Sequence, residues 1–62
     1  MPKPIKLKMI GLDGNAFAIM GAFRRQAKKE NWTESEINEV LTEAQKGDYH
    51  HLLATIMDNC KN

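Results

Sequence analysis

The chain has 62 residues and a formal net charge of +1, which limits it to one small domain near the lower size at which a protein folds alone. Cys60 is its one cysteine, so an internal disulfide is excluded, and with His50 and His51 it forms no recognisable zinc-ligand spacing. We expect an arm at residues 1–4 and a single domain over residues 5–62, without metal or cofactor. A chain this small without covalent cross-links is expected to form a homodimer or a higher homo-oligomer.

The lone cysteine, the absence of a signal peptide and the absence of a long apolar run predict a soluble, cytoplasmic protein with no membrane contact. Charge is unevenly distributed along the chain. Residues 1–29 hold seven cations against Asp13 alone, and residues 30–62 hold two cations against seven acids. The basic half suits an anionic ligand, while the acidic half argues against wrapping a nucleic acid. Alternatively, the two halves solvate the fold and pack against each other.

In chain order, the first predicted element is a short β-strand, because residues 5–9 alternate apolar and basic side chains. A lone strand needs a partner for its backbone hydrogen bonds. The same strand of a second copy would provide one in a twofold dimer. Alternatively, residues 5–10 run extended over the helices.

A first helix is predicted over residues 15–30, with Asn15 or Asp13 as its N-cap and Asn31 in its C-terminal turn. Its apolar residues at helical spacing are expected to face the core. These are Ala16, Phe17, Ile19, Met20, Phe23 and Ala27.

A second helix is predicted to begin at a capping box formed by Thr33 and Glu36 and to be ended by Gly47 in a left-handed conformation. Trp32, just before the cap, is expected to pack on Ile37. A third helix begins at once with Asp48 as its cap, and its expected core residues are Leu52, Leu53, Ile56 and Met57. The predicted fold class is therefore mainly α, with three helices and one short N-terminal strand.

The first candidate site is the glycine-bracketed turn at residues 11–17, which leads directly into the first helix. Free N–H groups and the helix dipole at such a turn favour a phosphate or a carboxylate. In the middle of the helix, Gly21 is followed at i+3, i+4 and i+7 by Arg24, Arg25 and Lys28, whose charges would surround the bare backbone. Alternatively, Gly21 allows another helix to approach and the cations are a solvated face.

The second candidate site is the glycine turn at residues 46–51, which leads into the third helix. Tyr49 is suited to stacking on a nucleobase, and His51 to donating a hydrogen bond to a ligand oxygen. Alternatively, Tyr49 is a structural anchor and His51 closes the Asp48 cap.

Two other classes of function are disfavoured by the residues present. The chain lacks a nucleophile beside a base, a carboxylate pair in apolar surroundings and a metal-ligand set, so we expect that it is not an enzyme. The second and third predicted helices, joined by a glycine turn, resemble a helix-turn-helix, but the cations lie on the first helix instead. DNA binding by a regulator is therefore the least favoured function.

The runs at residues 12–17, 20–21, 43–44, 47–49 and 51–53 together resemble a family of very short phage, prophage and bacterial proteins. Its pattern is D-G-N-A-F…G…E-A…G-D-Y-x-H-L-L, and the match covers residues 10–57. His50 departs from the acidic residue of that pattern, which puts a carboxylate role there in doubt. In size and style the chain is also similar to phage proteins that sequester histidine–ADP-ribose made by TIR-domain (Thoeris) defence.

That resemblance implies a sponge that binds a nucleotide-derived signal in the bacterial host without cleaving it. It would direct a diphosphate to the turn and to the arginines, ribose hydroxyls to the turn side chains and the base to an aromatic ring or imidazole. The predicted binding residues are Asp13, Gly14, Asn15, Phe17, Gly21, Arg24, Arg25, Tyr49 and His51. The alternative function is a small protein–protein interaction module, in which the turn is only architectural.

Overall fold

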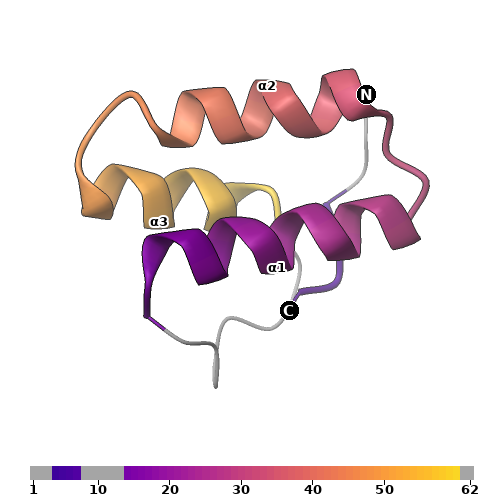
Figure 1. Cartoon of the computed structure of the whole chain (residues 1–62), viewed down its shortest axis with the longest axis horizontal. Helices are drawn as coiled ribbons and strands as arrows, with labels where there is room; N and C mark the ends of the chain where they lie inside the picture. Colours follow the sequence, from indigo (N-terminus) through magenta and orange to yellow (C-terminus); the bar gives the residue numbers. More distant parts are fainter. Residues whose placement is uncertain (1–3, 8–13, 61–62) are drawn as a thin grey trace.

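The computed structural model describes residues 4–7 and 14–60 and confirms a mainly helical domain of three helices. They are α1 (Ala16–Lys29), α2 (Glu34–Ala44) and α3 (Tyr49–Asp58). Helices α2 and α3 form an antiparallel hairpin, and α1 lies beside α3, so that α1 and α3 begin at the same end of the molecule (Figure 1). None of the helices in the described ranges is long and apolar enough to cross a lipid bilayer.

Each end of helix α1 is defined by hydrogen bonds that involve an asparagine. Of the two predicted caps, Asn15 is the N-cap, and its side chain accepts a 2.8 Å hydrogen bond from the Phe17 N–H. At the other end Asn31 has a φ of 69°. The N–H of Asn31 donates to the Lys28 carbonyl and that of Trp32 to the Ala27 carbonyl, which is the Schellman pattern of helix termination. The chain therefore turns back sharply at the predicted asparagine.

Helix α2 begins at the predicted capping box. The Thr33 hydroxyl accepts a 3.2 Å bond from the Glu36 N–H, and the Glu36 carboxylate accepts a 2.7 Å bond from the Thr33 N–H. The prediction that Gly47 ends this helix in a left-handed conformation was wrong. The helix closes at Gln45, and Gly47 does not adopt a positive φ, so its role is not that of a left-handed terminator.

The core contains apolar side chains from all three helices, the N-terminal segment and the loop before α2. Its buried members are Ile5, Ile19, Phe23, Ala27, Trp32, Ile37, Ala44, Leu52 and Ile56. The rings of Phe23 and Trp32 meet edge to face, with centroids 5.5 Å apart and planes at 88°. Such a pair adds specific aromatic attraction to the burial of two large apolar surfaces. Trp32 and Ile37 are both in this core, as expected for residues flanking the α2 cap.

Two residues assigned to the core from the sequence are exposed. The Phe17 side chain is 80% exposed and that of Met57 is 55% exposed. Phe17 lies six residues before Phe23, and six residues at 3.6 per turn place two side chains roughly 120° apart around the helix. Because Ile19 and Phe23 both face the core, Phe17 is turned toward solvent. Met57, one position after the buried Ile56, is rotated out of the core in the same way.

The N-terminal segment lies against the helices within the same chain. Ile5 is fully buried and forms an isolated parallel β-bridge with Cys60, and its N–H donates to the Asn59 carbonyl at 2.9 Å. The next N–H, of Lys6, donates to the Glu30 carboxylate at 2.7 Å. The described residues include this bridge but no β-strand, and residues 8–10 of the expected strand lie outside them. Pairing of that strand across a dimer stays a prediction.

We expect the domain to lose stability in mild acid through Glu30 and Glu34. Hydrogen bonds from the Gln26 amide and from the Lys6 N–H lower the pKa of Glu30, and Lys28 with Arg24 lowers that of Glu34. Since both values are lower in the folded state, their contribution is present above the ordinary value of 4.5 and is lost as the pH falls through the folded values. Thermal melts from about pH 6 to about pH 3 should show this loss.

The matched variants for this titration are Glu30→Gln and Glu39→Gln. Glu30→Gln should flatten the acid limb of the melting curve, since the variant has no carboxylate there to protonate. Glu39, on the outer face of α2, serves as the control. An identical acid limb in wild type and Glu30→Gln would show that Glu30 does not contribute to it.

Candidate functional site

One residue from each of the two predicted glycine turns, Gly14 and Tyr49, is in contact in the structure. The Tyr49 hydroxyl, in the first turn of α3, donates a hydrogen bond to the main-chain carbonyl of Gly14, just before α1. A Cβ added at Gly14 would lie 3.6 Å from that hydroxyl oxygen, an ordinary contact. The bond joins residues 35 positions apart and ties the beginnings of α1 and α3 together at one end of the domain (Figure 1). Asp13, also predicted here, lies outside the described residues.

This end of the molecule, which we call the α1–α3 end (Gly14, Asn15, Phe17 and Tyr49), combines two helix N-termini with exposed aromatic surface. Neither α1 nor α3 has an acidic residue within its first turn. The cap of α1 is the neutral Asn15, whereas that of α3 is Asp48, whose carboxylate offsets the positive end of the helix dipole. The N-terminus of α1 is thus the more suitable of the two for an anion. The rings of Phe17 and Tyr49 remain accessible, at 80% and 43% exposed.

The predicted cations lie elsewhere. Arg24 donates to one carboxylate oxygen of Glu34 at 2.9 Å, and the Lys28 ammonium lies 2.9 Å from the other. Arg24 follows Phe17 by seven residues, or about 10 Å along the helix axis. Arg25 is exposed and makes no ion pair within the described ranges. The arginine group is therefore separated from the α1–α3 end, and Arg24 is already engaged at the start of α2.

Gly21 lies on the outer face of α1 between these two groups. A Cβ added there would meet nothing within 4 Å, other than the helix's own backbone. The prediction that Gly21 leaves a bare spot is consistent with this geometry, and close approach by another helix of the same chain does not occur among the described residues.

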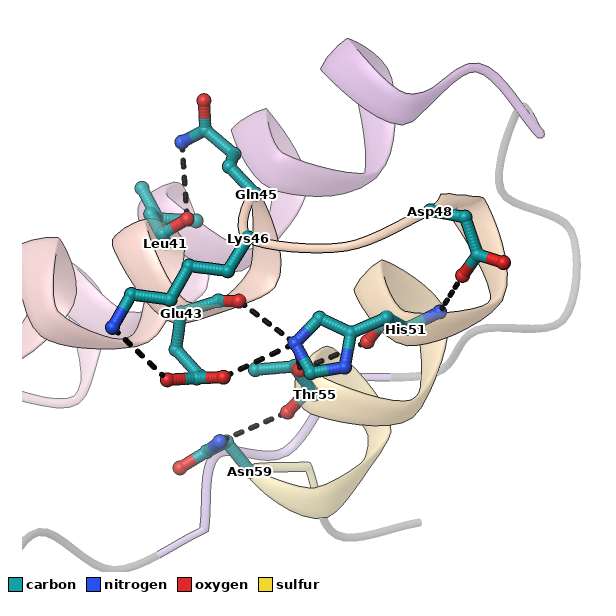
Figure 2. A network of polar contacts seen from close by, with 8 residues as sticks. All are labelled: Leu41, Glu43, Gln45, Lys46, Asp48, His51, Thr55 and Asn59. Atoms are coloured by element: carbon teal, nitrogen blue, oxygen red, sulfur yellow. Dashed lines mark hydrogen bonds and ion pairs between the residues drawn. The ribbon is translucent and has the colours of Figure 1, made fainter.

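His51 is held in a network that joins α2 to α3 (Figure 2). Its Nε2 lies 2.9 Å from the Glu43 carbonyl and 3.1 Å from the Glu43 carboxylate. Since the carbonyl only accepts, Nε2 carries the hydrogen in this arrangement. The His51 N–H donates to the Asp48 carboxylate at 2.9 Å, and the Thr55 hydroxyl donates to the His51 carbonyl at 2.8 Å. These contacts favour the structural alternative for His51, and its contact with a ligand stays a prediction.

Residue 47 must be glycine in this arrangement, because a side chain there would collide with His51. A Cβ at residue 47 would lie 2.8 Å from the His51 Cβ and 2.9 Å from its Cγ, closer than side-chain carbons pack. Gly47, Asp48, His51 and Glu43 together form what we call the α2–α3 lock. The Asp48 cap was predicted from the sequence, but the contact of His51 with Glu43 was not. The available signal was an acidic residue eight positions before a histidine, with a glycine turn between them.

Other features of the described residues do not extend the candidate site. They contain no group of three or more His, Cys, Asp or Glu residues that could hold a metal ion. Burial raises the pKa of the Cys60 thiol to about 11, so at neutral pH it is not a thiolate nucleophile. An open surface hollow of about 390 Å³ lies on the outer face of α2, lined by Ser35, Asn38, Glu39, Thr42 and Lys46. None of these is a predicted site residue.

No protein-family model, no curated protein and no solved structure matches this chain, so the family resemblance drawn from its motifs stays a prediction.

Proposed function

We propose that the chain binds a nucleotide-type small molecule of the ADP-ribose class at the α1–α3 end and sequesters it without chemical change. The observation that carries the proposal is the Tyr49–Gly14 hydrogen bond, which makes one composite end out of two turns far apart in the sequence. A role in phage counter-defence in the bacterial cytoplasm rests on the motif resemblance alone.

The chemistry of the α1–α3 end matches the parts of such a ligand. A flat base has accessible aromatic surface on Phe17 and Tyr49, and stacking on aromatic rings is sequence-tolerant but strong. A diphosphate is favoured at the neutral-capped N-terminus of α1. Asp13 and Asn15 are the side chains proposed for the ribose hydroxyls. Sequestration without turnover is proposed from the residue inventory of the sequence, in which no nucleophile is recognised beside a base.

The test is a thermal-shift and calorimetry screen of the purified chain with ADP-ribose, histidine–ADP-ribose and simple nucleotides. A ligand present at 100 times its dissociation constant adds about 2.7 kcal/mol of stability, which shifts the melting temperature of a domain this small by many degrees. Recovery of the intact ligand after the protein is denatured would establish sequestration. A cleaved ligand would contradict it.

Two matched substitutions locate the binding. Tyr49→Ala removes the ring and the bond to Gly14, and we expect it to weaken binding at least about fivefold, by analogy with lost base stacking worth about 1–3 kcal/mol. Met57→Ala removes another exposed apolar side chain, on the C-terminal half of α3, and should leave affinity unchanged. Equal losses in the two variants would show that the site is not at the α1–α3 end.

The second candidate function is a protein-interaction module. It is favoured by the outer face of α1, where Gly21 has open space and Phe17 is highly exposed. A screen without any ligand-induced shift would make this function the leading one, and pull-down from infected cells would follow.

A further inference from the structure

The outer face of α1 is the part of the described structure least explained by the packing of the chain itself. Gly21 is in the middle of a helix, where glycine costs roughly 1 kcal/mol relative to alanine, yet no other part of the described ranges comes within 4 Å of a Cβ placed there. One turn before it, Phe17 exposes an apolar ring to solvent. Four residues after it, Arg25 carries a charge with no ion-pair partner in the described ranges.

Charge along this face is divided between its two halves. The half before Gly21 carries Phe17 and Ala18 and no charged residue, and the half after it carries the cations Arg24, Arg25, Lys28 and Lys29. Two such faces are complementary only when they run antiparallel. A parallel pair would set each cation against its own copy, whereas an antiparallel pair centred on Gly21 sets the cationic half of each helix against the aromatic half of the other.

We propose that two copies of this chain pair through antiparallel α1 helices that cross at Gly21 on a twofold axis. Phe17 and Arg25 are each four residues, or about 6 Å, from Gly21 along the axis, so each Phe17 faces the partner's Arg25. An arginine over an aromatic ring is an attractive cation–π contact. The two copies of Arg25 are about 12 Å apart along the axes, beyond the roughly 8 Å screening length at physiological salt. The crossing at glycine allows the two backbones to approach closely.

The pairing has a consequence for the α1–α3 end, which rests on the proposed function. Within one chain the arginine group is separated from that end by about 10 Å along α1. In the antiparallel pair the partner's Arg25 lies over Phe17, and the partner's Lys28, which also pairs with Glu34 of its own chain, lies toward Gly14. The dimer would thus bring to each ligand site the cations for a diphosphate that the site's own chain holds farther along the helix.

The pairing is tested without any ligand, by sedimentation equilibrium of the full chain over a wide concentration range. We expect a dimer of the 7.1 kDa chain, and we expect Gly21→Gln to weaken its association at least a hundredfold. Asn38→Gln, on the outer face of α2, is the matched control and should leave association unchanged. A wild-type chain that stays monomeric, or a dimer that is unaffected by Gly21→Gln, would overturn the proposal.

Cross-linking provides a second measurement that does not depend on the folding of Gly21→Gln. In a Cys60→Ser background, Gly21→Cys lies on the proposed twofold axis, so two copies should form a disulfide readily under mild oxidation. Asn38→Cys in the same background should not. Equal cross-linking of the two variants would contradict an interface at Gly21.

Contribution of the partner to the ligand site is tested by mixing two binding-deficient variants, Tyr49→Ala and the double variant Arg25→Ala/Lys28→Ala. Random exchange of subunits produces one intact site in each mixed dimer, so about a quarter of the sites should recover. No recovery from a mixture shown to exchange would place the cations and the aromatic ring in the same chain. Failure of the wild type to bind any ligand would instead overturn the proposed function and leave the dimer result standing.

Discussion

Phe23→Ala is expected to unfold a large fraction of the chain at 25 °C, whereas Phe17→Ala should leave it folded. Phe23 is fully buried and packs edge to face on Trp32, at the contact between α1 and the loop before α2. Truncating a buried phenylalanine costs about 3–5 kcal/mol, and a core in a domain this small rarely provides more than about 3–5 kcal/mol of net stability. The expected loss of stability is therefore about as large as the whole free energy of unfolding.

The matched control for Phe23→Ala is the same change six positions earlier in the same helix. Phe17 is 80% exposed, so Phe17→Ala removes little buried surface, and alanine is the better helix former. Its free energy of unfolding should stay within about 0.5 kcal/mol of the wild type. Urea titrations followed by circular dichroism, at protein concentrations low enough to keep the chain monomeric, would measure both.

Two outcomes of this comparison would contradict the structure. If Phe17→Ala destabilised the dilute chain as much as Phe23→Ala, the ring at position 17 would belong to the core, as its place in the apolar pattern first indicated. If Phe23→Ala cost less than about 1 kcal/mol, the aromatic pair would not be central to the packing.

The helices and their caps were predictable because the determinants are local. The capping box of Thr33 and Glu36, the asparagine caps and the aspartate before α3 each act within three or four residues, so the sequence pattern contains the whole interaction. Which face of α1 packs against the core was harder to predict. An apolar stripe that includes both Phe17 and Phe23 spans a wide arc of α1, and the neighbouring helices and Trp32 decide which part of the arc is buried.

The long-range contacts were not predictable in the same way. The bridge between Ile5 and Cys60 and the bond between Tyr49 and Gly14 join residues that have no local relation. For the candidate site, both glycine turns and the glycine on the outer face of α1 were predicted from the sequence. It did not reveal that Arg24 is engaged by Glu34, because an exposed ion pair leaves no periodic signal.

Gly47→Ala and Gly21→Ala, two identical substitutions, are expected to change stability in opposite directions. The methyl group at residue 47 would lie 2.8 Å from the His51 Cβ, an atom fixed by the backbone that no rotamer change moves away. The turn must shift, and the contacts of His51 with Glu43 shift with it. Overpacking of this kind costs about 1–3 kcal/mol. At residue 21 the methyl group meets open space, so the gain in helix propensity should stabilise the chain by about 1 kcal/mol.

Thermal melts of the dilute protein measure both changes, since 1 kcal/mol corresponds to about 4–8 °C in a domain of this size. The ring signals of His51 in an NMR spectrum provide a second readout, which Gly47→Ala should move and Gly21→Ala should not. If Gly47→Ala left the melting temperature unchanged, residue 47 and His51 would not lie as close together as they do in the α2–α3 lock. If Gly21→Ala destabilised the monomer, α1 would have a packing partner within its own chain, and its outer face would not be available to a second copy.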